Sequence, residues 1–386
     1  MKKIKNKLFY VYSLLLYFIL AAAAFVLSVM FLELDVRSFF ISKFAAIIPG
    51  VSNNAVVIVY DQTSQNKLGK FQTKYIAELL DYFYTYNKNP KVIGVDAMID
   101  FEPVPELLNL INKSDNIVLG FTPAQHTTEK QNPDYIKKFA LNVTNNSVNF
   151  DTKLTGISKI HKSVLDKSKN IASVAIHNEK DKGTVFASTN IVKINDNYFA
   201  SLPLKMFMVA NKTNELSINE DYIIIDKLNL KIPHNRIKEN IIQTNLRYYA
   251  PTIGAKGVKR DYTHLEISAY DIITLYRKLK TGQKLTEREK NLHNNIFNQN
   301  SAIFIGEFTD GPSTDFLISP LSSRHPGVDV QATTYSNIEN NEYIYNIGIL
   351  GKLITIFIIG FLTFFCVFRF NFIKSLALVL LIDILF

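Results

Sequence analysis

Apolar residues along this chain form long runs near its two ends and short runs between them. The first long run, 8–32, has no charged residue over about 25 positions, enough for a helix to cross a hydrocarbon layer of about 30 Å. A second run covers 347–368, with Lys352 near its start. A third, 375–386, is apolar but too short to span. The pattern predicts two transmembrane helices followed by an incomplete third.

The charges that flank these runs predict their orientation. Four lysines lie in the tail 1–7, whereas Glu33 and Asp35 follow the first span, and Arg369 and Lys374 flank the turn 369–374. By the positive-inside rule, the tail and the turn are cytoplasmic and the segment 33–345 is extracytoplasmic. A cleaved signal peptide is the alternative for 8–32, but its apolar core would be shorter. We therefore expect a multi-pass protein of the inner cell membrane, whose end is either truncated or shallow in the bilayer.

Short apolar runs in the segment 33–345 lack the alternation of a half-exposed strand. Such continuous runs are typical of strands buried on both faces of a parallel sheet, and they occur at 55–60, 92–95, 116–120 and 302–306. Between the first two, 70–86 has apolar residues at helical spacing. This order predicts a strand, a helix and a second parallel strand.

The remaining segments complete an α/β prediction. The stretch 122–170 is polar and reads as an irregular insertion, and further strands are expected at 171–176, 190–194, 222–225, 228–232 and 241–249. Helices are expected at 36–48, 202–209, 268–278, 285–297 and 328–338. Thr286 and Glu289 have the spacing of a capping box. The predicted fold is a largely buried, mainly parallel or mixed sheet with flanking helices, carried on transmembrane helices.

Composition narrows the classes of function. The formal net charge is +9, but the lysines are scattered among asparagines rather than gathered in a basic stripe, so we expect no nucleic-acid partner. The single cysteine, Cys366, lies in an apolar run, which excludes a disulfide framework. No phosphate-binding loop, dinucleotide fingerprint or hydrolase motif occurs, and no histidines are paired at metal-ligand spacing. We expect no metal and no cofactor.

Acidic residues follow the predicted buried strands. Asp61 and Asp96 follow the first two strands, and Glu307 follows the last, with Asp310 and Asp315 in the next loop. Ligands of open α/β sheets bind beyond the carboxyl ends of the strands. If the strands are parallel neighbours, these carboxylates form an acidic rim suited to a cation, a metal ion or a hydrogen-bonding ligand such as a sugar. The alternative, which the sequence favours, is that they cap helices or turns.

The loop that follows the last strand is the other candidate ligand-binding element. Thr309, Asp310 and Asp315 belong to a Gly-Pro turn rich in hydroxyls and carboxylates, which is either a cleft loop or an ordinary turn. His325 lies nearby and either hydrogen-bonds a ligand or is an exposed loop histidine, the reading that its loop position favours. The predicted helix 328–338 then leads towards the second span.

These motifs resemble the type-two CHASE domain, a sensing domain found outside the membrane in bacterial receptors. The resemblance rests on VVIVYDQTSQNKLGKFQTKYIAELLDYF with VIGVDAMIDF at the start. At the end it rests on LRYYAP, SAYDIITL and AIFIGEFTDGPSTDFLISPLSSRHPGVDVQATTYSNI. Ser319 stands where the family usually has Thr, the usual Trp-Pro-rich loop is replaced by Gly69–Lys74, and the central Asp-Gly-Arg-like motif has only a weak counterpart at Asp181–Gly183.

The resemblance and the layout together favour a membrane-anchored sensor over other functions. We expect an unidentified small ligand, contact with membrane lipid, a homodimer and a possible cytoplasmic signalling partner, because members of the family usually continue into an output enzyme that this chain does not contain. The chain itself is not expected to be an enzyme. A scaffolding membrane protein and an extracytoplasmic enzyme that uses the acidic cluster are the alternatives.

Overall fold

The computed structural model describes the greater part of the segment between the two predicted spans. The described residues are 55–86, 88–124, 133–150, 154, 156–158, 160–176, 184–234, 236–238, 241–249, 263–295, 301–309, 316–345, 354, 357, 358, 360 and 361. The compact unit that contains the sheets is 40–344. Within the described part of the chain, no helix has both the length and the apolar character needed to cross a bilayer. The predicted spans 8–32 and 347–368 and the predicted helix 36–48 lie wholly or almost wholly outside that part.

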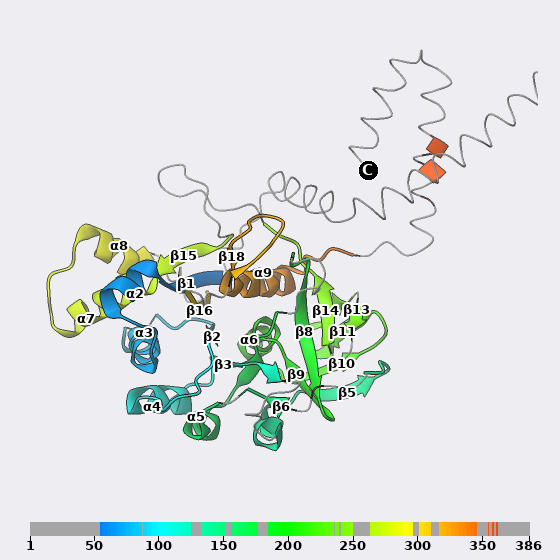
Figure 1. The fold of residues 1–386 in the computed structure, drawn as a ribbon, viewed down its shortest axis with the longest axis horizontal. Helices are drawn as coiled ribbons and strands as arrows, with labels where there is room; N and C mark the ends of the chain where they lie inside the picture. Colours follow the sequence, from blue (N-terminus) through cyan, green and yellow to red (C-terminus); the bar gives the residue numbers. More distant parts are fainter. Residues whose placement is uncertain are drawn as a thin grey trace, which may run out of the picture. The chain divides into compact units, whose positions relative to one another are not determined.

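The core of the unit is a six-stranded sheet in the order β15-β1-β16-β2-β3-β7, and every strand pair in it is parallel. Its strands are Leu265–Ser268 (β15), Ala55–Asp61 (β1), Ala302–Phe308 (β16), Val92–Asp96 (β2), Ile117–Phe121 (β3) and Ile171–Ser173 (β7). The four strands predicted from continuous apolar runs are therefore confirmed as the centre of a buried parallel sheet. The class is mixed α/β, with a mainly parallel central sheet and flanking helices (Figure 1).

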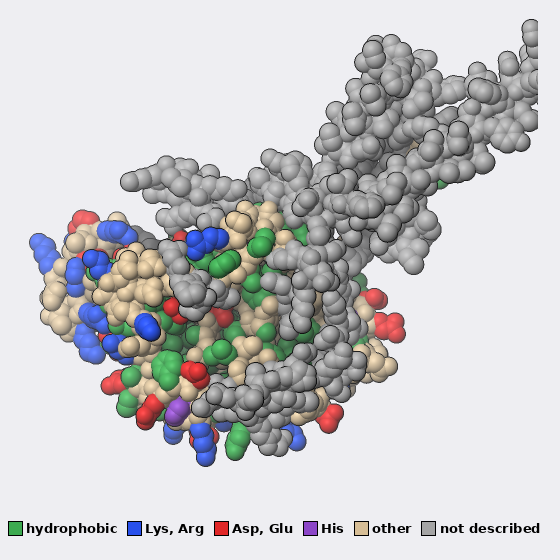
Figure 2. All heavy atoms as spheres, viewed as in Figure 1, with side chains coloured by type: hydrophobic (Ala, Val, Ile, Leu, Met, Phe, Trp, Pro, Cys, Tyr) green, Lys and Arg blue, Asp and Glu red, His purple; other side chains and the backbone are tan. Residues whose placement is uncertain are grey.

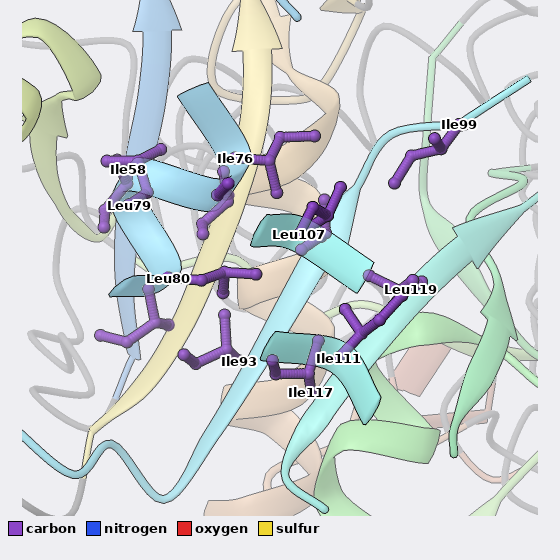
Figure 3. Packing of buried hydrophobic residues seen from close by; sticks show 14 of the residues in the cluster. Ile58, Ile76, Leu79, Leu80, Ile93, Ile99, Leu107, Ile111, Ile117 and Leu119 are labelled. Carbon is purple, nitrogen blue, oxygen red and sulfur yellow. The ribbon is translucent and has the colours of Figure 1, made fainter. Parts of the chain in front are cut away.

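Helices cover both faces of this sheet, which explains why its strands are apolar without alternation. In β1, Val56 and Ile58 belong to one apolar cluster, whereas Val57 and Val59 belong to another. The first cluster includes residues of α3, α4, α5, α7 and α8; these helices are Thr73–Thr85, Pro105–Lys113, Lys162–Lys167, Ala269–Lys280 and Glu287–Asn295. Figure 3 shows its central part, where isoleucines and leucines of α3 and α4 pack on the strands.

The second cluster contains α6 (Leu202–Ala210) and α9 (Gly327–Asn340), together with residues of two smaller sheets. One is β12-β11-β10-β5, formed by Leu230–Pro233, Tyr222–Ile225, Glu215–Ile218 and Asn142–Asn146. The other is β13-β14-β8-β9, formed by Arg236–Lys238, Ile241–Asn245, Ala187–Ile194 and Asn197–Ala200. The helix α9 is buried along almost its whole length. It is therefore a core element, which its modest number of apolar residues did not suggest.

In the described parts of the polar stretch 122–170, the elements are all short, as predicted for an insertion. They are two-residue strands β4 (Pro123–Ala124) and β6 (Gly156–Ile157), the 3-10 helix Pro133–Phe139, β5 and α5. The predicted capping box is present at α8: the backbone N–H of Thr286 donates to Glu289 Oε2 at 2.8 Å, and the backbone N–H of Glu289 donates to Thr286 Oγ1 at 3.3 Å. The sequence did not predict α2 (Gln62–Leu68), which is almost entirely polar.

Lysine and arginine side chains gather over α2, α7 and α8 on the face shown in Figure 2. Four of them pair with carboxylates: Arg277 with Glu78, Lys278 with Glu289, Arg288 with Asp271 and Lys290 with Glu287. This surface is therefore mixed in sign rather than a continuous basic patch.

Candidate functional site

The carboxyl ends of β2, β3, β7 and β16 border a cleft of ≈520 Å³, which lies where parallel α/β sheets usually bind ligands. Asp96, Asp100 and Glu307 contribute carboxylates, whereas Phe71, Val174 and Leu317 contribute apolar surface. Met98 and Phe101 also line it and leave 46% and 48% of their surface exposed. Large apolar side chains left open beside carboxylates are a feature of ligand clefts rather than of a sealed core.

Asp96 and Glu307 are brought together by strand register. In the β16–β2 pair, Asp96 lies opposite Gly306, the residue before Glu307, and both carboxylates line the cleft. Partial burial raises the pKa of Glu307 above its usual value. The structure thus places two of the predicted site residues on one wall.

Asp61 lies at the same edge of the sheet but has a different role. It is the N-cap of α2, where its Oδ1 accepts hydrogen bonds from the Ser64 backbone N–H at 2.7 Å and from Ser268 Oγ at 2.9 Å. An N-cap side chain satisfies an amide that the helix itself leaves unpaired. The capping alternative therefore describes Asp61, which is not among the cleft-lining residues.

Two further site residues, Asp310 and Asp315, lie outside the described residues. Thr309 is buried directly after β16. The expectation that His325 is an exposed loop histidine is wrong, because the side chain is completely buried. It belongs to β18 (His325–Pro326), which pairs with β17 (Phe316–Leu317) immediately before α9.

His325 is part of a buried polar network centred on Asp329 in the first turn of α9. Asp329 Oδ2 accepts from His325 Nε2 at 2.8 Å, and Oδ1 contacts His264 Nδ1 at 2.8 Å. Thr263 adds its backbone N–H at 2.7 Å and its hydroxyl at 2.9 Å. His264, His325 and Asp329 are all fully buried.

These contacts keep Asp329 ionised inside the protein. Burial alone acts to raise the pKa of Asp329, but the charges and hydrogen bonds of His264 and His325 outweigh it and hold the pKa well below its usual range. The amino end of α9 adds a favourable dipole. A carboxylate without such donors would be too costly to bury.

Each histidine of the network also contacts a serine. His264 Nε2 lies 2.9 Å from Ser336 Oγ, and His325 Nδ1 lies 2.9 Å from Ser319 Oγ. The order serine, histidine, aspartate is that of a hydrolytic triad. However, both histidines are completely buried, and Ser336 and Ser319 have exposed fractions of only 0% and 6%, so neither hydroxyl is open to a substrate. We therefore assign the network a structural role.

Sequence reasoning missed this network because its members are far apart in the chain. His325 and Asp329 are four residues apart, but His325 lies in β18, before α9 begins, so helical spacing does not predict their contact. Nothing in the sequence around Thr263 and His264 indicates burial. Among the described residues, no group of three or more His, Cys, Asp or Glu side chains could hold a metal ion.

A comparison with protein-family models matches the CHASE2 domain over residues 14–366, nearly the whole chain. No curated protein and no solved structure matches the chain.

Proposed function

This chain belongs to the CHASE2 family, and from that membership we propose that it is the ligand-binding input part of a membrane receptor. CHASE2 domains are extracytoplasmic sensing domains of such receptors. In the proposal, a small molecule binds in the cleft at the carboxyl ends of the strands, and its binding shifts α9. The predicted spans 8–32 and 347–368 anchor the domain in the bilayer, and a homodimer passes the change to a cytoplasmic output partner.

The observation that carries this proposal is that cleft-lining segments also contact α9. Glu307 lines the cleft, and the residue before it, Gly306, packs against α9 so closely that an added Cβ would lie 2.8 Å from Val328 Cβ. At this point the Val328 side chain of α9 packs directly on the backbone of Gly306. A displacement of Glu307 by a ligand therefore acts directly on the first turn of α9.

A second cleft-lining residue, Val174, contacts the same helix. Val174 lines the cleft, and its backbone carbonyl accepts a hydrogen bond from Gln331 Nε2 of α9 at 2.9 Å. The Gln331 side chain is almost fully buried, so losing this bond would leave polar atoms unsatisfied. Ligand contact at Glu307 or at Val174 thus has a short route to α9.

A ligand screen with a matched pair of variants tests the proposal. The purified full-length chain is screened by thermal shift against amino acids, sugars, polyamines and divalent cations. Ala97→Trp fills the cleft, whereas Thr274→Trp places the same bulk in a smaller pocket between α7 and α8. A ligand at 100 times its Kd stabilises the folded state by about 2.7 kcal/mol.

We expect the stabilisation by a hit to disappear in Ala97→Trp and to persist in Thr274→Trp. Stabilisation that survives in Ala97→Trp would place the ligand outside the cleft and contradict the proposal. A double variant, Asp310→Asn with Asp315→Asn, tests whether these two carboxylates contribute to the site. The measurement is again the thermal stabilisation by the ligand.

A further inference from the structure

One wall of the cleft includes a segment held in place quite differently from the sheet. This segment, which we call the strap, is Phe316–Pro326. Its ends pair with each other, Phe316 with Pro326 and Leu317 with His325. Leu317 lines the cleft, while the backbone carbonyl of the next residue, Ile318, accepts from the Val185 N–H at 2.8 Å. The strap therefore lies between the cleft and the start of α9.

Apolar packing beneath the strap is slight. Its Leu317 and Leu321 are only partly buried, against a small cluster that includes Tyr248 and Val330 and is separate from the two main clusters of the core. Phe316 and Ile318 are 46% and 44% exposed. Segments with little buried apolar surface open at a lower free energy than the sheet they adjoin.

Polar contacts hold the strap instead. Ser319 Oγ accepts the backbone N–H groups of Leu321 and Ser322, each at 3.1 Å. The same hydroxyl lies 2.9 Å from His325 Nδ1, and His325 Nε2 lies 2.8 Å from Asp329 Oδ2. The His325 side chain is thus held between the turn of the strap and α9.

Asp329 does not depend on the strap for its own position. Thr263 and His264 donate to the same carboxylate from the segment that enters β15. If the strap moves away, Asp329 loses one donor and retains the others. The carboxylate is therefore a fixed point on α9 that the strap can join and leave.

We propose that the strap is a movable wall of the cleft, latched to α9 by the hydrogen-bond chain from Ser319 through His325 to Asp329. Opening of the latch widens the cleft and at the same time frees the first turn of α9. The latch rests on these contacts alone, and only its use in signalling rests on the proposed function. A ligand that contacts Leu317 would then favour one position of the strap over the other.

Hydrogen exchange of the full-length chain tests the latch. The reporter is the Val185 amide, which bonds to the strap at Ile318 but makes no bond to Ser319 or His325. Ser319→Ala and His325→Gln each break the chain, whereas Ser336→Ala breaks the other arm of the same network, at His264. A net hydrogen bond of about 1 kcal/mol corresponds to roughly fivefold in an opening equilibrium.

We expect Val185 to exchange about fivefold faster in His325→Gln, and at least as much faster in Ser319→Ala, which also removes the acceptor of the Leu321 and Ser322 amides. Ser336→Ala should leave it within about twofold of the wild type. An unchanged Val185 in the first two variants, or an equal rise in Ser336→Ala, would overturn the latch.

The wild-type chain supplies a second measurement if a variant does not fold. At increasing urea concentrations, Val185 should exchange through an opening that costs less than the one that exposes the amides of β16. Equal opening free energies for the two would mean that the strap opens only when the domain unfolds, and the latch would be wrong. Neither result bears on the ligand screen with Ala97→Trp, so the two proposals can fail separately.

Discussion

At the scale of single residues, the buried polar network depends on the side chain of Asp329. It has no exposed surface, yet Thr263 and His264 from a distant segment, and His325 from the strap, all make hydrogen bonds with its two oxygens. Removing one partner of a buried charge pair costs more than the pair contributes, because the remaining groups stay buried and unsatisfied. Asp329 should therefore matter more to stability than the ion pairs on the surface.

Asp329→Asn should lower the free energy of unfolding by about 3 to 5 kcal/mol. The amide keeps the shape of the side chain but presents N–H groups to histidine and threonine donors. Urea titration of the full-length chain measures the loss. The matched control is Asp115→Asn, which removes a carboxylate that is 87% exposed and paired with Lys169, and should cost less than about 1 kcal/mol. Equal losses in the two variants would contradict the assignment.

The stabilisation due to Asp329 should also depend on pH with a definite sign. Its pKa is lower in the folded than in the unfolded chain, where a value of about 3.9 is expected, so the folded state holds the proton less tightly. Asp329 therefore contributes its full stabilisation at pH values above its pKa in the unfolded chain. This stabilisation is lost as the pH falls from that pKa towards the lower pKa of the folded state. The difference in unfolding free energy between wild type and Asp329→Asn should stay constant near pH 5 and shrink below about pH 4. Urea titrations from pH 5 to pH 2 check this, and a difference that grows towards acid would refute it.

At the scale of elements, the sequence predicted the buried strands better than it predicted their order in the sheet or the polar helix α2. β1, β2, β3 and β16 were readable because each is buried on both faces and apolar throughout. The position of β16 between β1 and β2 was not readable, since more than 200 residues separate β16 from them and periodicity carries no information on pairing. The segment α2 was missed because it is polar and has no apolar stripe.

The candidate site was predictable only where it follows from sheet topology. Asp96 and Glu307 meet because parallel strands end at one edge, a rule that needs no coordinates. Asp61 ends a strand of the same sheet, and His325 follows the loop after β16. The roles of both side chains are decided by local hydrogen bonds. Those bonds depend on Ser64, Ser268 and Ser319, residues whose contacts cannot be inferred from spacing alone.

The contact between β16 and α9 should be sensitive to a single methyl group. Gly306→Ala would place a Cβ 2.8 Å from Val328 Cβ and 3.0 Å from its Cγ2, and a β-branched side chain on a helix cannot rotate away. We expect a loss of about 1 to 3 kcal/mol in unfolding free energy. In the Gly306→Ala background, Val328→Ala should restore part of it, as a double-mutant cycle of urea titrations would show.

Gly94→Ala is the comparison for this element. Its added Cβ would meet mainly the Met206 side chain, which is flexible and can move aside. The loss should therefore be smaller than in Gly306→Ala. A larger loss in Gly94→Ala than in Gly306→Ala would show that the approach of β16 to α9 is not the limiting contact.

At the scale of the whole molecule, the receptor proposal requires the sheet domain to lie outside the membrane between two spans. Lysines precede the first apolar run and Arg369 and Lys374 follow the second, so both runs predict the same orientation.

Alkaline phosphatase forms its disulfides only in an oxidising compartment. Fused after Asn341 it should be active in bacterial cells, and fused after Asn371 it should be inactive. A fluorescent protein that matures in the cytoplasm should give the reverse pattern at both points. Replacing Lys2, Lys3, Lys5 and Lys7 with Gln should weaken the asymmetry, because these charges hold the amino-terminal tail in the cytoplasm. Phosphatase activity at both fusion points, or at Asn371 alone, would contradict the predicted topology and with it the anchored receptor.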